Sequence, residues 1–150
     1  MYKRQGIADS LKIGLRLNLT YWTLQLAEAQ VLGSALDDAL ETVDQALRAN
    51  PDELVYRPEA LRMRGELRLK QGSAELAQVD FREAIAVAQS MSAKAWELRA
   101  TMSLARLLNA ARRDEARTML SDIYNWFTEG FETPDLKEAR ALLDELGAKR

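Results

Sequence analysis

The chain of 150 residues contains no cysteine and no histidine. Without cysteine it can form neither a disulfide nor a thiolate metal site, and this points to a reducing compartment. Without histidine it lacks the commonest general base at neutral pH and the commonest zinc ligand. Most hydrolase mechanisms are thereby excluded, and we expect no enzymatic activity, no cofactor and no bound metal.

Neither sign of charge dominates, because 21 Lys and Arg residues are interleaved with 23 Asp and Glu residues. Binding to a nucleic-acid backbone normally needs a dense basic face, so we expect no nucleic-acid partner. Long apolar runs are also missing. The first residues carry too many charges for a secretory signal, and the uncharged run within 17–27 is too short and polar for a span of about 20 apolar residues. The sequence predicts a cytoplasmic protein without membrane contact.

Glycine and proline are scarce, with 7 and 3 residues, and the stretches between them are rich in Ala, Leu, Glu, Arg and Gln. This composition favours helices, and no pair of alternating runs around a hairpin turn predicts strands. The pattern of breakers predicts helices at about residues 4–14, 20–32, 35–49, 58–71, 74–90, 94–110, 114–129 and 134–147. Ser34 with Asp37, and Ser73, are the predicted N-caps.

The apolar surface differs in width between successive predicted helices. At 58–71 and 94–110 apolar residues surround the helix, whereas at 35–49, 74–90 and 114–129 they form one narrower stripe. Alternating wide and narrow helices are typical of a solenoid of helical hairpins, because one helix of each pair is packed on several sides. A four-helix bundle would instead show similar stripes on every helix.

An internal repeat supports this all-α solenoid. Three sets of residues share the offsets 12, 4 and 3, and the sets recur after 38 and then 39 residues. The sets are Ala27, Ala39, Val43 and Ala46; Gly65, Ala77, Phe81 and Ala84; and Leu104, Ala116, Leu120 and Ile123. The small residues among them would allow the two helices of a hairpin to approach closely.

Three segments carry a resemblance to a known family: RPEALRMRGEL at 57–67, WELRA at 96–100 and YNWFTEGFETPDL at 124–136. They resemble the C-terminal tetratricopeptide (TPR) region of bacterial class III adenylate and guanylate cyclases and of transcriptional regulators with a STAND-type ATPase. With the repeat, this predicts one TPR-like domain over 1–150, with repeats at about 20–49, 58–90 and 94–129 and a capping helix at about 134–147. The third repeat departs from the pattern, because Leu104 stands where glycine or alanine is commoner.

The resemblance does not extend to nucleotide chemistry, because the chain has no P-loop motif and no assignable cyclase metal-binding aspartate. A helix at 4–14 would be the second half of a hairpin that lacks its first half. This suggests a fragment of a longer protein or a degenerate gene product. Its uncovered apolar face makes a structural homo-oligomerisation unit the alternative function, and a DNA-binding helix-turn-helix is a third, less favoured hypothesis.

In TPR hairpins the first helix of each pair lines a concave groove. The residues predicted to bind a partner there are Tyr21, Leu24, Glu28, Glu59, Arg62, Glu66, Lys70, Leu98, Thr101 and Asn109. The leading hypothesis is a regulatory module whose groove holds a peptide or a partner domain, including attached cyclase or ATPase domains, with Arg62 and Lys70 meeting carboxylates. The alternative is that these charges are solvated or paired between hairpins, such as Glu66 with Arg99 or Arg106.

Four aromatic residues cluster near the end of the chain: Tyr124, Trp126, Phe127 and Phe131. They could line a ligand pocket, but the preferred interpretation is that they pack the end of the solenoid against the capping helix. Trp96 is likewise expected in the core. Adjacent acids such as Asp37 and Asp38 lie near helix ends and point in different directions, so they are not expected to act as acid–base pairs.

Overall fold

The computed structural model describes residues 35–49, 55–109 and 111–147, together with Leu24, Ala27, Glu28, Gln30 and Leu32. Over these residues the chain is all-helical and contains no strand. The helices are α2 (Leu36–Ala49), α3 (Arg57–Lys70), α4 (Ala74–Ser90), α5 (Lys94–Leu108), α6 (Arg113–Tyr124) and α7 (Pro134–Gly147). The predicted helix at 4–14 and the predicted cap at Ser34 lie outside the described residues.

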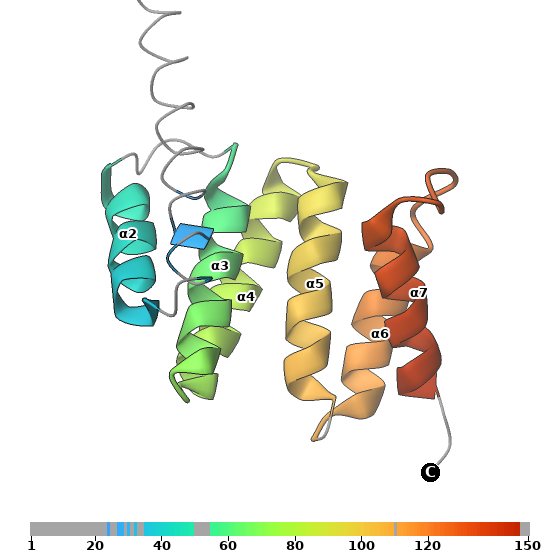
Figure 1. Ribbon diagram of the computed structural model, residues 1–150. Coiled ribbons are helices and arrows are strands. Elements are labelled where there is room, and N and C mark those ends of the chain that lie inside the picture. The colour runs from blue at the N-terminus through green and yellow to red at the C-terminus, as the bar shows by residue number, and fades with distance from the viewer. Residues whose placement is uncertain are drawn as a thin grey trace, which may run out of the picture.

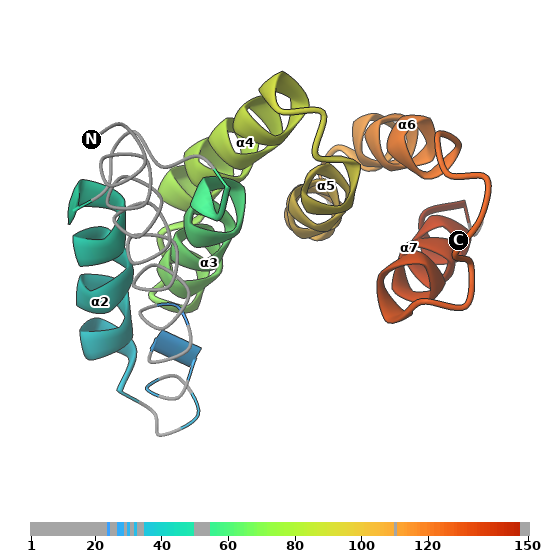
Figure 2. The same ribbon diagram turned by 90° about the horizontal axis from the view of Figure 1, so that it is seen from above.

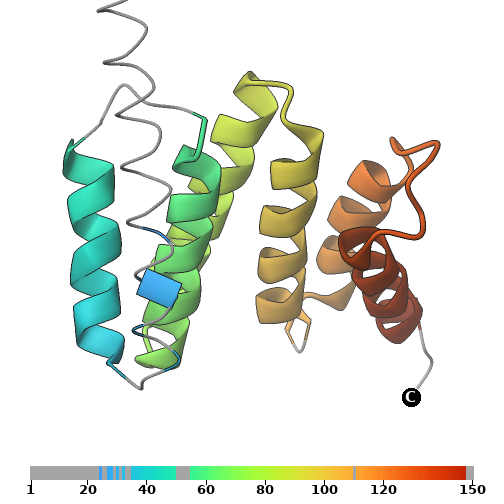
Figure 3. The ribbon, with the colours of Figure 1, turned by 45° about the horizontal axis from the view of Figure 1, so that its top comes forward.

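The helices follow one another in a single antiparallel row from α2 to α7 (Figure 1). Each helix packs against the next along the chain, and α5 also contacts α3 and α7. Seen from above, α3, α5 and α7 lie on one side of the row and α4 and α6 on the other (Figure 2). A tilted view shows α4 behind α3 and α6 behind α7 (Figure 3). The described helices thus form an open row rather than a closed four-helix bundle.

The turns that join α3 to α4 and α4 to α5 share one geometry. The N–H groups of Ser73 and Ala93 each reach back five residues to a carbonyl, at 2.8 Å and 2.9 Å. This closure of a helix end requires a left-handed residue, which is Gly72 (φ +84°) in the first turn and Ser92 (φ +54°) in the second. Ser73 precedes α4 as predicted, but its side chain makes no capping hydrogen bond.

The helix predicted at 114–129 is shorter in the structure, because α6 ends at Tyr124. The N–H of Phe127 then bonds the carbonyl of Tyr124 at 3.1 Å in a tight turn, and the chain leaves the helix axis. As a result Phe127 packs against the core, and the ring of Phe131 lies 5.8 Å from that of Tyr124. Similarly, the helix predicted to extend to residue 110 ends at Leu108.

The core confirms the predicted difference in apolar width. In α5, 9 of 15 residues are buried, whereas α6 buries only Ala116, Leu120 and Ile123. Every member of the three repeat sets is buried. One cluster of buried side chains joins α2 and α3, and a second extends from α4 to α7. The two leucines at repeat positions, Leu104 and Leu120, each stabilise the fold by about 1.5–3 kcal/mol through burial.

Gly65 of α3 lies directly against the ring of Phe81 of α4, which is fully buried. A Cβ atom at Gly65 would lie 2.7 Å from the Cδ1 atom of that ring and closer still to Cε1. Ala77 and Ala84, about one turn to either side of Phe81, are also fully buried. Small side chains therefore lie where α3 and α4 meet, as the repeat predicted, and the lack of a side chain at position 65 sets the spacing of the two helices.

Replacing Gly65 by alanine should lower the free energy of unfolding by about 1–2 kcal/mol, because overpacking a core costs about 1–3 kcal/mol and alanine's helix propensity returns up to about 1 kcal/mol. Urea denaturation measures the change. In a Phe81→Leu background the same substitution should cost less, because the opposing ring is gone. An equal cost in the two backgrounds would contradict the proposed contact.

Candidate functional site

A groove with a volume of about 300 Å³ lies along α3. Met63 and Leu67, both buried, form its floor, and Leu32 borders it with 88% of its surface exposed. Four charged residues complete the lining: Glu28, Arg62, Glu66 and Lys70. The three on α3 recur every four residues and so share one face of the helix, which gives the groove an apolar floor with cations and anions beside it.

The structure brings four of the predicted partner-binding residues together in this groove, namely Glu28, Arg62, Glu66 and Lys70. Tyr21 lies outside the described residues. Glu59 is buried at the start of α3, and Thr101 is buried beside a second groove. Asn109 follows the end of α5, where its Oδ1 atom is buried without a hydrogen-bond partner among the described residues. The predicted face is therefore divided between several environments.

Leu24 and Leu98 do not line the groove, so the prediction was wrong about the direction of these two side chains. They are 5% and 1% exposed and belong to the two core clusters. A helix that is packed on several sides has more than one apolar face, and helical periodicity alone does not say which face is open. Leucine gains about 1.5–3 kcal/mol from full burial, which favours the packed side.

Ion pairs neutralise charges elsewhere on the side of the row formed by α3, α5 and α7. The guanidinium of Arg62 donates two hydrogen bonds to the carboxylate of Glu59, which is 7% exposed. Arg99 of α5 pairs with the same carboxylate at 2.8 Å and lies 3.8 Å from Asp135 of α7. These contacts link three helices in succession and leave little free charge at Glu59.

Glu66 is not part of this network, so the predicted pairing of Glu66 with Arg99 or Arg106 was wrong. Arg106 instead pairs with Glu138 of α7 at 3.5 Å. Arg99 pairs with Glu59 at the start of α3 and with Asp135 of α7, so neither arginine has Glu66 as its partner. Within the described part of the chain, Glu66 and Lys70 form no ion pair or hydrogen bond. The groove therefore retains two charged side chains that form no ion pair with a described residue.

Arg62 presents a fixed positive charge to the groove. Its burial alone would lower the pKa, but the hydrogen bonds that Arg62 donates to Glu59 and the negative charges of Glu59, Glu66 and Asp135 outweigh this effect. The pKa of Arg62 is therefore raised above its ordinary value. Arg62 stays charged at physiological pH, and its bond to Glu59 fixes the direction of the guanidinium.

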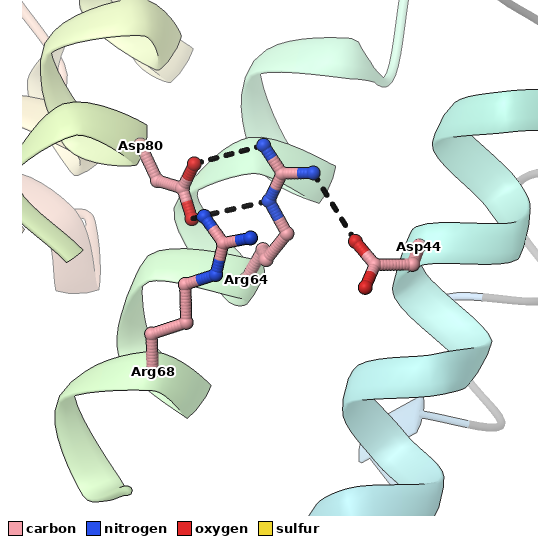
Figure 4. Close-up of polar contacts among 4 residues, drawn as sticks. All are labelled: Asp44, Arg64, Arg68 and Asp80. Atoms are coloured by element: carbon pink, nitrogen blue, oxygen red, sulfur yellow. Dashed lines mark hydrogen bonds and ion pairs between the residues drawn. The ribbon is translucent and has the colours of Figure 1, made fainter. Parts of the chain in front are cut away.

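The other side of α3 is joined to its neighbours by a buried acid (Figure 4). Asp80 of α4, with a side chain 1% exposed, accepts hydrogen bonds from Arg64 at 2.9 and 3.1 Å and from Arg68 at 2.9 Å. Arg64 also reaches Asp44 of α2 at 3.1 Å. Burial would lower the pKa of Arg64, but Asp80 and Asp44 raise it above its ordinary value. This network ties α2, α3 and α4 together.

Asp80 was not among the predicted functional residues, although the sequence contains a pattern that indicates its role. Asp80 lies beside Phe81 on the buried stripe of α4, where an acid is costly unless cations surround it. Arg64 and Arg68 stand four residues apart on α3, and so on one face of the preceding helix. An acid within an apolar stripe, opposite two such arginines, would have predicted the network.

The aromatic residues near the end of the chain are divided between core and surface. Tyr124 and Phe127 pack against the core cluster that includes α7, as predicted. Trp126 and Phe131 are 57% and 43% exposed, so the prediction of core packing was wrong for them. The early end of α6 is the reason, because in the turn after Tyr124 Phe127 faces the core while Trp126 and Phe131 stay largely exposed. Trp96 is partly buried rather than part of a core cluster.

No protein-family model matches this chain, and no curated protein matches its sequence significantly. Across the described ranges, no helix is both long enough and apolar enough to cross a membrane. The same residues contain no group of three or more acids placed to hold a metal ion. The interpretation of the α3 groove therefore rests on its own geometry and charges.

Replacing Asp80 by alanine should lower the free energy of unfolding by about 3 kcal/mol, because Arg64 and Arg68 lose their buried acceptor. Asp144→Ala is the matched control, since its ion pair with Arg140 lies at the surface and such pairs contribute less than about 1 kcal/mol. Guanidinium denaturation of both variants measures the difference. Equal losses would show that the Asp80 network adds no more than a surface pair.

Proposed function

We propose that this chain is a protein-binding helical-repeat module of the TPR type, which holds a segment of a partner in the α3 groove and performs no chemistry of its own. The open row of antiparallel helices and the buried repeat positions support a TPR-like arrangement. The observation that carries the proposal is the groove itself. It combines an apolar floor at Met63 and Leu67 with charges at Glu66 and Lys70 that form no ion pair or hydrogen bond with a described residue.

The dimensions of the groove favour a few side chains of a peptide. Its volume of about 300 Å³ is at the lower limit of small-molecule pockets, which range over about 300–1,000 Å³. Apolar side chains of a peptide would contact Met63 and Leu67. Carboxylates beside them would meet Arg62 and Lys70, and a cation would meet Glu66. The preferred ligand is thus an amphipathic segment that carries both signs of charge.

The cellular role that we propose is regulatory. The segment RPEALRMRGEL carries part of the resemblance to the TPR regions of bacterial cyclases and STAND-type regulators. The same segment supplies five residues of the α3 groove and of the Arg62–Glu59 ion pair beside it. These are Glu59, Arg62, Met63, Glu66 and Leu67. In such a setting the module would bind a partner and relay its presence to attached catalytic domains. Nucleotide chemistry would then belong to those domains.

Exchanging the groove charges in the double variant Glu66→Lys, Lys70→Glu should weaken peptide binding. The probes are peptides selected on the unmodified chain from a random display library, and the measurement is isothermal titration calorimetry. We expect affinities to fall by at least about tenfold, because each retained contact becomes a like-charge contact. The exchange leaves the net charge and the composition of α3 unchanged, so any loss of affinity reports the positions of the two charges alone.

The matched control is the double variant Glu132→Lys, Lys137→Glu, which reverses an exposed ion pair at α7. It should bind the selected peptides as tightly as the unmodified chain. Circular dichroism should show the same helix content for both double variants. A library that yields no peptide ligand, or ligands that bind the Glu66 and Lys70 variant unchanged, would overturn the proposed groove.

The alternative function, homo-oligomerisation, is favoured by exposed apolar side chains; among those described, Leu32 beside the groove is the most exposed at 88%. The others, such as Leu76 and Val79 of α4, do not line this groove, and scattered exposed apolar residues are common on monomers. We therefore expect a monomer at high micromolar concentration. Light scattering after gel filtration measures this, with Leu32→Glu as the comparison variant. A dimer that this substitution dissociates would favour the oligomer over the peptide-binding module.

A further inference from the structure

A second groove, with a volume of about 290 Å³, lies between α4 and α6 above one face of α5. Its lining residues are Ile85, Gln89, Lys94, Glu97, Thr101, Met119, Asp122, Ile123 and Trp126. Figure 2 shows α4 and α6 on the opposite side of the row from α3 and α7. This groove is therefore separate from the α3 groove and shares no lining residue with it.

Apolar side chains form the walls of the second groove. An ion pair between Arg82 of α4 and Glu115 of α6, at 3.1 Å, bridges the two helices at one end. Ile85 follows on α4, and Met119 and Ile123 follow on α6, each about one helical turn farther along. These side chains face one groove from both helices and offer contacts to an aliphatic chain.

The other end of the groove, away from the Arg82–Glu115 ion pair, already holds the side-chain cation of Lys94. The Nζ atom of Lys94 lies 3.2 Å from the Oε1 atom of Glu97 and 5.7 Å from the centroid of the Trp126 ring. Trp126 itself is 57% exposed, although an indole of this size gains from burial. A carboxylate on one side and an open indole ring on the other form the surroundings that recognise a positively charged group.

The charge of the groove favours a second cation. Glu97 and Asp122 contribute two negative charges and Lys94 one positive charge. Asp122 is exposed and forms no ion pair or hydrogen bond within the described residues. The helices α4 and α6 both end beside the groove, at Ser90 and Tyr124, and their negative ends add to the attraction. α5 begins there too, but Glu97 in its first turn already complements its positive end.

We propose that the α4–α6 groove is a second protein-recognition site, which takes an arginine side chain of a partner segment with an apolar residue beside it. The guanidinium stacks on the Trp126 ring and donates two parallel hydrogen bonds to Asp122. The apolar neighbour contacts Ile85 and Met119. Lys94 occupies the cation position in the free protein and swings out to solvent when the arginine enters.

This assignment makes Lys94 a competitor of the ligand. An anionic ligand would use Lys94 as its main contact, but it would then lie beside Glu97 and Asp122 and be repelled by both. The two assignments predict opposite effects of removing the lysine charge. Lys94→Met keeps the length of the side chain and removes its charge, so this variant separates them.

The probe is the peptide acetyl-Leu-Arg-Leu-amide, titrated into the full chain labelled with ¹⁵N. The indole N–H signal of Trp126 reports binding, assigned by its disappearance in Trp126→Phe. We expect this signal to shift with the arginine peptide and to shift far less with the same peptide carrying citrulline, the uncharged isostere. Lys94→Met should tighten binding at least about threefold and Asp122→Asn should weaken it by a similar factor, as exposed cation–π and charge contacts suggest.

Asp144→Asn, a neutralisation at the exposed face of α7, should leave the titration unchanged. The exchange of Glu66 and Lys70 should also leave it unchanged, so failure at the α3 groove is distinguishable from failure here. Three results would overturn the proposal: no shift of the Trp126 signal, equal shifts with arginine and citrulline peptides, or weaker binding of the arginine peptide by Lys94→Met.

Discussion

The contact between Gly65 and Phe81 is the constraint on which the rest of the structure depends. Arg64 precedes this glycine and Asp80 precedes this phenylalanine, so the apolar contact and the ion network belong to the same helix crossing. A larger side chain at position 65 would move α3 away from α4 and lengthen the bonds from Arg64 to Asp80. The packing of one ring therefore keeps a buried carboxylate within reach of the cations that offset the cost of its burial.

Arginine and lysine residues lie on two sides of α3, one that packs against α4 and one that lines the groove. Arg64 and Arg68 turn toward Asp80 and hold the helix in the row. Arg62 lies about 200° from Arg64 on the helix and lines the groove with Lys70. Because the first pair is tied to α4, the groove side of α3 cannot rotate freely. The charges proposed to meet a ligand are thus positioned by charges that never contact it, which lowers the entropy lost on binding.

Sequence periodicity predicted the helices and the buried repeat positions well, because both depend on residues close in the chain. The bounds of α4 and the burial of Phe81 follow from such patterns. Periodicity did not predict which side of a multiply packed helix stays open, so Leu98 was placed in the groove although it lies in the core. The end of α6 and the exposure of Trp126 depend on how the turn after α6 packs against α7. The periodicity of the α6 segment alone does not indicate this packing.

Two grooves on opposite sides of one row constrain what the module can do under the two proposals. A single short segment is not expected to enter both, because one groove lies along α3 and the other lies between α4 and α6 with no lining residue in common. Each groove, near 300 Å³, contacts only a few side chains, so each alone would give weak binding. Two separate weak sites are suited to joining two partners, or to binding two distant segments of one partner. When both segments belong to one partner, binding at the first site raises the effective concentration of the second segment and so strengthens the overall binding. A scaffold of this kind gains affinity from assembly rather than from the depth of either site.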